Sequence, residues 1–117
     1  MQSPSAKPKR GEVWMLDLDP TRGQEQAGTR PALVTSVDLF NAGAAGLVIV
    51  CPITSKNKGV RTHVPVVPPE AGVSQSRYIK CEDVRSVSRD RLIRRLGEAS
   101  PDTIREVESR LRILLGL

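Results

Sequence analysis

The chain has 117 residues, of which 38% are hydrophobic and 26% charged. This length and composition are typical of one soluble globular domain with a modest hydrophobic core. The formal net charge of +5 and the sequence pI of about 9.8 favour an anionic partner, such as nucleic acid, a membrane surface or an acidic protein, although a merely soluble basic surface has the same composition.

Several classes of protein are disfavoured. No apolar run approaches the roughly 20 residues that a membrane-spanning helix needs. Segment 1–10 is basic but no apolar stretch follows it, so it does not read as a secretory signal. We expect a disordered basic lead over 1–10 and a single folded domain over 11–117.

The cysteine content points to a reducing compartment. Cys51 and Cys81 are too few for a disulfide framework. A zinc site is disfavoured because the chain has no C-x-x-C pair and only one histidine. We expect both cysteines to be buried free thiols in a reducing cytosol, which predicts a cytoplasmic protein.

Apolar alternation and β-branched residues predict a series of short strands. The expected strands are 13–18, 32–37, 47–51, 62–67, 76–81, 84–87 and 93–96. Segment 47–51 is a continuous apolar run and is therefore expected to be a central strand. The remaining segments are a polar loop at 19–30, turns at 41–46 and 70–73, a cationic loop at 55–59 and a short helical turn at 89–92.

One long helix is expected at the C-terminus. Ser100 suits the N-cap, Pro101 the first helical position and Asp102 the positive end of the helix. Gly116 ends it. Its apolar face consists of Ile104, Val107, Leu111 and Leu114. Short strands with Gly/Pro turns and one closing helix predict a small barrel of the α+β class, mainly β with a C-terminal helix.

The segment 19–34 joins the first two expected strands and is rich in charge, and loops held by rigid strands often carry function. Within it, Glu25-Gln26-Ala27-Gly28 is followed by Thr29-Arg30-Pro31. This stretch closely resembles the loop of the MazF/PemK family of bacterial toxins, small endoribonucleases that cleave messenger RNA at short sequences. The resemblance covers 11–115 and implies an SH3-like barrel of the MazF/CcdB type, with the C-terminal helix packed on the sheet.

RNA cleavage without a metal ion needs three contributions from the protein. One group must accept the proton of the ribose 2′-hydroxyl, another must protonate the leaving 5′-oxygen, and a third must stabilise the pentavalent phosphate. A design with two histidines is excluded because His63 is alone, and no cluster of carboxylates with histidine suggests a two-metal site. Any cleavage must therefore use Arg, Thr, Ser, Glu or Asp.

Arg30 is the first candidate. A guanidinium matches two phosphate oxygens at once, and the following Pro31 fixes the backbone. From the loop alone, a surface arginine that pairs with Glu25 is an equally good interpretation. The resemblance implies the catalytic role, because the arginine of the family's Gly-x-Arg-Pro motif is catalytic and falls on Arg30.

Two further roles depend on the resemblance. Thr54 ends the central strand; by itself it reads as an ordinary strand-end threonine, but the family's catalytic threonine falls at this point. Glu25 matches a glutamate on which family members depend, and the sequence leaves open whether it acts as a base or orients Arg30. Thr29 stands where some relatives carry histidine, so any contribution from that histidine is missing here.

A wider set of residues is expected to contact RNA. These are Lys56, Lys58, Arg61, Arg77, Lys80, Ser55 and Thr29. A run of charge is more often a solvated surface, but Lys56 and Lys58 flank the loop after Thr54 and are favoured for that reason. Aromatic residues are scarce, so bases are expected to be read by hydrogen bonds in a groove rather than by stacking. Trp14 and His63 are expected to be structural.

The leading hypothesis is the toxin of a toxin–antitoxin pair: a metal-independent, sequence-specific endoribonuclease that acts on single-stranded RNA without a cofactor. The resemblance implies 2′,3′-cyclic phosphate and 5′-hydroxyl ends, a homodimer, and a MazE-like antitoxin with a disordered acidic segment. A gyrase poison like CcdB is disfavoured because that relative relies on a Trp-Gly-Ile C-terminus, whereas this chain ends Leu115-Gly116-Leu117. A non-catalytic RNA-binding barrel is the third hypothesis.

Overall fold

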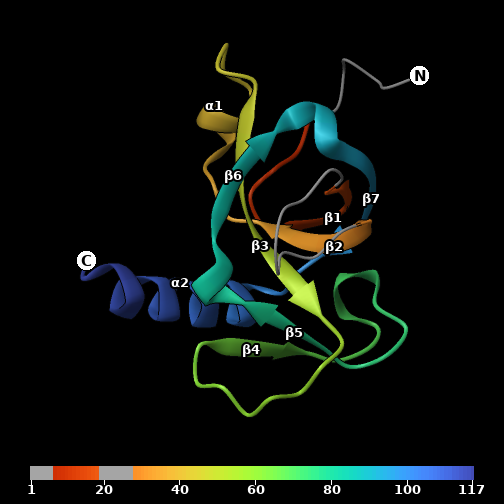
Figure 1. Ribbon diagram of the computed structural model, residues 1–117, viewed down its shortest axis with the longest axis vertical. Coiled ribbons are helices and arrows are strands. Elements are labelled where there is room, and N and C mark those ends of the chain that lie inside the picture. Colours follow the sequence, from red (N-terminus) through yellow and green to blue (C-terminus); the bar gives the residue numbers. More distant parts are fainter. Residues whose placement is uncertain (1–6, 19–27) are drawn as a thin grey trace.

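The computed structural model describes residues 7–18 and 28–117, and over these residues the chain is mainly β (Figure 1). The strands are β1 (Glu12–Asp17), β2 (Thr29–Val34), β3 (Leu47–Thr54), β4 (His63–Val66), β5 (Arg77–Lys80), β6 (Arg85–Ser88) and β7 (Leu92–Glu98). The helices are α1 (Asp38–Asn41) and α2 (Pro101–Leu115), and the 3₁₀ turns are η1 (Glu70–Gly72), η2 (Cys81–Asp83) and η3 (Arg89–Arg91).

The strands form one curved antiparallel sheet. Its order is β4-β5-β3-β2-β1-β7, and β6 pairs with β3 beside this path. Figure 1 shows the sheet curling round its own interior, with α2 lying across the end that holds β4 and β5. The expected mainly β, barrel-like fold with a C-terminal helix is therefore confirmed.

Strand β3 is the centre of the fold. It pairs with β2, β5 and β6, and its burial extends through Thr54. Neighbouring residues on it enter different core clusters: Cys51 packs with Val13, Leu33 and the helix, whereas Val50 packs with residues of β1, β6 and β7. Because both faces are covered, the strand reads as a continuous apolar run, as expected for a central strand.

The C-terminal helix begins and ends as its sequence predicts. The Ser100 hydroxyl accepts a hydrogen bond from the Thr103 amide at 3.2 Å, and Gly116 takes the left-handed conformation that closes the helix. Val107 is buried against the sheet. Leu114, by contrast, is 40% exposed, because the last turn of the helix extends beyond the core.

Some segments differ from expectation. Strand β2 begins at Thr29 rather than at residue 32, because its first residues pair with the end of β1. The expected turn at 41–46 is preceded by the short helix α1, in which the buried Asn41 side chain donates to the Ser36 carbonyl at 3.0 Å. The Arg89 side chain of η3 donates to the Asn41 carbonyl and ties the helix to the rest of the fold. Strand β7 runs from Leu92 to Glu98, longer than the expected 93–96, because it pairs along the whole of β1.

The edges of the domain are held by polar contacts. Arg10 forms an ion pair with Glu108 of α2, and its amide donates to Asp38 Oδ1 at 2.7 Å. Cys51 and Cys81 are buried free thiols, as expected. In the part of the chain that the structure describes, no helix is long and apolar enough to cross a membrane.

Candidate nucleic-acid interface

A cavity of about 290 Å³ opens where β1, β2, β3, β5 and β7 approach the segment after β4. Its apolar lining consists of Met15, Pro31, Ile53, Val73 and Leu96. Its polar lining consists of Thr29, Ser55 and Ser74, together with Arg30, Arg77 and Arg94. The combination of an apolar surface with hydroxyl and guanidinium groups suits a ligand that has both a flat apolar part and negative charge.

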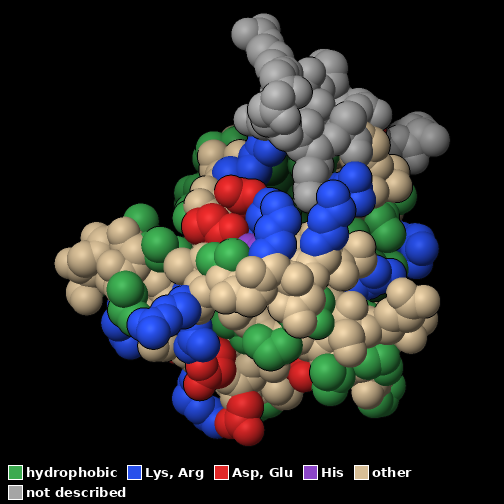
Figure 2. Space-filling model, turned by 60° about the horizontal axis from the view of Figure 1, so that its bottom comes forward, with side chains coloured by type: hydrophobic (Ala, Val, Ile, Leu, Met, Phe, Trp, Pro, Cys, Tyr) green, Lys and Arg blue, Asp and Glu red, His purple; other side chains and the backbone are tan. Residues whose placement is uncertain are grey.

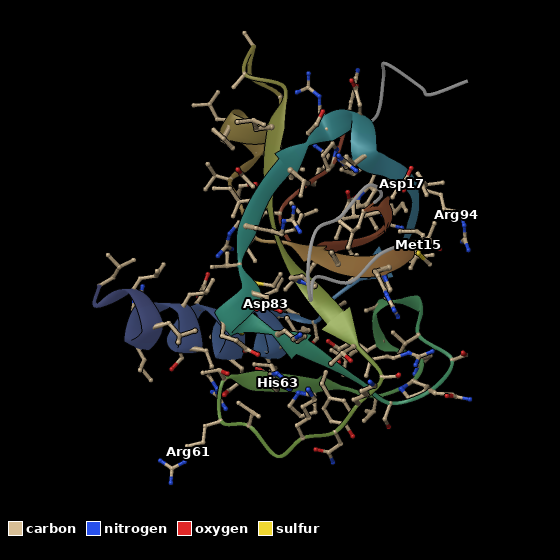
Figure 3. All side chains as sticks on the ribbon, viewed as in Figure 1. Met15, Asp17, Arg61, His63, Asp83 and Arg94 are labelled. Carbon is tan, nitrogen blue, oxygen red and sulfur yellow. The ribbon has the colours of Figure 1, made fainter. Side chains whose placement is uncertain are left out.

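The pairing of the strands fixes one wall of the cavity. On β1, Met15 lies opposite Pro31 of β2 and also opposite Arg94 of β7. Residues that pair directly in an antiparallel sheet have their side chains on the same face. Pro31, Met15 and Arg94 therefore form a row across three neighbouring strands, and Figure 3 shows Arg94 beside Met15, extending from the edge of the sheet.

The charge of the cavity is not compensated by its own lining. Among residues 7–18 and 28–117, none of those that line it is an aspartate or glutamate. Within residues 7–18 and 28–117, no ion pair joins Arg30, Arg77 or Arg94 to a carboxylate. Three guanidinium groups around one cavity repel each other and concentrate positive potential there, which favours binding of an anion.

Four of the residues expected at the site meet in this cavity: Arg30, Thr29, Ser55 and Arg77. Thr54 does not line it, although its neighbours Ile53 and Ser55 do, because alternation along β3 turns its side chain to the other face. Thr54 is only 9% exposed, and its hydroxyl accepts a hydrogen bond from the Lys56 amide at 3.2 Å. Glu25 lies outside the described residues.

The other expected RNA contacts lie elsewhere. Lys56, Lys58 and Arg61 are exposed on the connection between β3 and β4 and do not line the cavity. In Figure 3, Arg61 lies at the opposite end of the molecule from Met15 and Arg94. The Lys80 ammonium lies 2.8 Å from Asp83, so its charge is already compensated.

His63 is part of a polar cluster next to β5. Its Nε2 lies 2.8 Å from Glu82 Oε2, and the Thr62 hydroxyl donates to the other Glu82 oxygen at 2.7 Å. Burial opposes ionisation of Glu82, but the hydrogen bonds from Thr62, its own backbone and His63 outweigh it and hold the pKa of this carboxyl below its usual value. These contacts fit the structural role expected for His63.

Several lining residues were not expected from the sequence, above all Met15 and Arg94. Met15 reads as an ordinary strand residue, and Arg94 is one half of an Arg-Arg pair in a strand. Alternation alone indicates that one arginine of such a pair faces each side. The neighbour Arg95 faces the other way, and its Nε lies 2.9 Å from Glu12 Oε2. Only the pairing of β7 with β1 tells which arginine meets the cavity.

The surface view shows where charged side chains gather on one face. In Figure 2, Lys and Arg side chains lie across the middle and right of this face, and at its upper left and lower left they lie beside Asp and Glu side chains. Positive charge without neighbouring carboxylates is therefore confined, on this face, to its middle and right, where it favours an anionic partner.

The fold and the cavity define a small, barrel-like β protein with a cationic site, and comparison with known proteins gives the family. Residues 9–115 match the family described as PemK-like, MazF-like toxin of type II toxin-antitoxin system. The chain therefore belongs to this family.

The individual relatives agree. The chain is 34% identical over 114 residues to endoribonuclease MazF9 of Mycobacterium tuberculosis, covering 93% of this chain and 97% of that protein. It resembles the crystal structure of MazF from Deinococcus radiodurans with a TM-score of 0.82 and 38% identity, covering 96% of this chain and 99% of the other. A MazE–MazF crystal structure from D. radiodurans matches with a TM-score of 0.79 and 38% identity, over 96% and 98% of the two chains.

Proposed function

We propose that this MazF-family toxin is an endoribonuclease that cuts single-stranded RNA at a short recognition sequence without a metal ion or other cofactor. The observation that carries the proposal is the cavity lined by Arg30, Arg77 and Arg94, to which no described residue contributes a carboxylate. The phosphodiester of an RNA strand is negatively charged and would pair with these arginines. The base of the same nucleotide is flat and largely apolar and would pack on the apolar part of the lining.

The proposed reaction is attack of a ribose 2′-hydroxyl on the adjacent phosphorus, with departure of the 5′-oxygen. It leaves a 2′,3′-cyclic phosphate and a 5′-hydroxyl. Arg30 stabilises the charge that builds up on the phosphate oxygens, since its planar group holds two of them at once. Ser55, which lines the cavity, orients the phosphate through its hydroxyl, and Thr54 contributes through the hydrogen bond with the Lys56 amide that shapes this loop. Glu25 either accepts the 2′-proton or positions Arg30.

The donor groups of the described residues support the proposed independence from metal ions. Mg²⁺ and similar ions are held by clustered carboxylates, with histidine or cysteine added for softer metals. Among residues 7–18 and 28–117, no three His, Cys, Asp or Glu side chains come together in that way. The arginines supply the positive charge that metal ions supply in other nucleases. Recognition of the RNA sequence is assigned to the segments 21–30 and 54–61.

The proposed partners are a second copy of the chain and an antitoxin. A relative from D. radiodurans has been solved as a MazE–MazF complex. The surface that attracts phosphate groups also attracts acidic side chains, so an antitoxin segment rich in Asp and Glu is proposed to occupy the same cavity and to exclude RNA. The homodimer is tested by light scattering on the purified chain. The proposed location is the cytoplasm, where messenger RNA is found.

The test is incubation of the purified chain with a long single-stranded RNA in EDTA, followed by primer extension. We expect discrete cuts that share one short sequence and products that carry a 5′-hydroxyl. The Arg30→Ala variant, which is expected to be inactive and is purified in the same way, controls for contaminating ribonuclease. Absence of cuts by a protein shown to be folded would overturn the proposal, as would cuts that appear only when Mg²⁺ is restored.

A further inference from the structure

We infer that Arg94 binds a phosphate of the RNA strand at the β1–β7 edge of the cavity, next to the nucleotide that is cut. The inference rests on the proposed function and extends it. A nucleotide that flanks the cut would be bound by a residue outside the loop 19–30, which carries the family motif. Arg94 belongs to β7, which is far from that loop in the sequence.

The first support is the contrast between two adjacent arginines. Arg95 is engaged on the outer face of β7, with its Nε 2.9 Å from Glu12 and its Nη2 3.5 Å from Glu98. Arg94 is also exposed, lines the cavity, and has no ion pair with a carboxylate of the described residues. Within the described residues, the Arg95 guanidinium is therefore engaged by carboxylates, whereas that of Arg94 remains available to an anionic ligand.

The second support is what surrounds Arg94. Met15 lies directly opposite it on β1, with Pro31 beyond on β2, and Leu96 follows on the same face of β7. These side chains form an apolar strip beside a guanidinium. A nucleotide presents the matching pair of surfaces, since its base is flat and mostly apolar and its phosphate is charged. Arginine also suits phosphate better than lysine because its donors form a planar fork.

The third support is the position of Arg94 relative to the other two arginines that line the cavity. Arg30 and Arg77 line the same cavity from β2 and β5, whereas Arg94 lines it from β7, at one edge of the sheet. A single phosphate does not need three arginines that come from three separate strands. Distribution over β2, β5 and β7 fits successive phosphates of one extended strand, and RNA is preferred to an acidic peptide because the strip of Met15 and Leu96 offers a place for a base.

The experiment measures binding separately from cleavage. The probe is a fluorescein-labelled pool of short, random-sequence RNAs in which every ribose carries 2′-fluorine, so that no attacking hydroxyl exists and no recognition sequence has to be known. Dissociation constants are measured in EDTA at several salt concentrations for the full-length chain, for Arg94→Gln, and for the matched control Arg95→Gln. Circular dichroism confirms that each variant is folded.

We expect Arg94→Gln to weaken binding about five- to tenfold at low salt and to reduce the slope of log K against log salt by about 0.7, the value for one lost phosphate contact on a single strand. Arg95→Gln is expected to stay within about twofold of the original chain with an unchanged slope. Equal behaviour of the two variants, or an unmodified chain that does not bind the pool, overturns the inference.

The result separates this inference from the proposed function. If the original chain cuts RNA but Arg94→Gln binds the pool as tightly as the original chain does, the proposed function is supported and the inference about Arg94 is overturned. If the original chain cuts no RNA but Arg94→Gln shows the predicted change in affinity and slope, Arg94 is supported as a phosphate contact and the proposed cleavage is overturned. If Arg94→Gln affects only binding of a polyglutamate peptide, Arg94 serves a protein partner and the inference is wrong.

Discussion

The Thr54 hydroxyl accepts a hydrogen bond from the Lys56 amide at 3.2 Å, and this contact turns the chain out of β3 into the loop that follows. A hydroxyl that accepts from an amide two residues ahead forms a local turn of the kind that Ser and Thr favour. Between these two residues, Ser55 is the one that lines the cavity. Two adjacent hydroxyls are thus available at the end of the central strand, in different settings.

The first prediction separates these two hydroxyls. Thr54→Val is expected to lower kcat about a hundredfold, because it removes the hydrogen bond that shapes the loop and holds Ser55 at the cavity. Thr54→Ser, which keeps the hydroxyl, is expected to stay within about tenfold of the original chain. Single-turnover cleavage of a mapped RNA measures both. A larger loss in Ser55→Ala than in Thr54→Val would transfer the catalytic role to Ser55.

The second prediction concerns Arg30. Arg30→Ala is expected to reduce the cleavage rate by about a thousandfold or more, since it removes the positive charge that stabilises the pentavalent phosphate of the transition state. Arg30→Lys is expected to recover little, because an ammonium cannot hold two phosphate oxygens in a plane. The melting temperature is expected to change little, because Arg30 is exposed and has no ion pair within the described residues. An active Arg30→Ala protein would contradict the assignment.

The third prediction concerns Gly72, which lines the cavity and has a φ of 74°. A Cβ there would overlap the Leu96 carbonyl oxygen of β7, so Gly72→Ala has to push η1 away from the sheet. We expect a loss of more than about 2 kcal/mol in unfolding free energy, measured by urea denaturation. Gly59, with a φ of 64° and open space around it, is the matched control. Gly59→Ala is expected to cost only the conformational penalty of about 1 kcal/mol.

The fourth prediction concerns pH and Glu12. Burial opposes ionisation of this carboxyl, but hydrogen bonds from the Trp14 indole, the Lys9 amide and Arg95 outweigh it and hold its pKa below the usual value. A lowered pKa in the folded state means that ionised Glu12 stabilises the fold above the unfolded-state pKa, and that this contribution is lost as the pH falls through the lower, folded-state value.

Glu12→Gln is therefore expected to destabilise the chain by about 1 kcal/mol near neutral pH and to cost progressively less as the solution is acidified below about pH 4.5. Urea denaturation across this range measures the difference. Glu98→Gln, which removes an exposed carboxylate that contacts Arg95 only at 3.5 Å, serves as the control and is expected to change little. A penalty for Glu12→Gln that does not depend on pH would show that packing, not charge, is what Glu12 supplies.

Much of the fold could be predicted because local signals and tertiary structure agree. The apolar run Leu47–Cys51 lies at the centre of the sheet, and Ser100 and Gly116 bound the helix that their chemistry favours. Helix α1 could not be predicted, since its end is held by the Arg89 side chain, which donates to the Asn41 carbonyl from 48 residues further along the chain.

The candidate site was predictable only in part. Arg30 and Thr29 lie in a loop motif that a family resemblance identifies, and Ser55 and Arg77 follow from their positions near strand ends. The choice between Arg94 and Arg95 depends on which strand pairs with β7 and in what register. Lys80 looks like a free cation in the sequence, but the 3₁₀ turn η2 brings Asp83, three residues further on, to its ammonium.

The cavity takes its lining from Met15 near one end of the chain to Leu96 near the other, so neither half of the sequence contains a whole site. The connection at 55–61 is exposed and contributes only Ser55 to that lining. A gene divided within this connection would yield two harmless fragments, each missing part of the arginine set. Activity would return only where both fragments are made and reassemble. If each fragment were expressed from its own promoter, activity would show that both promoters are active in the same cell.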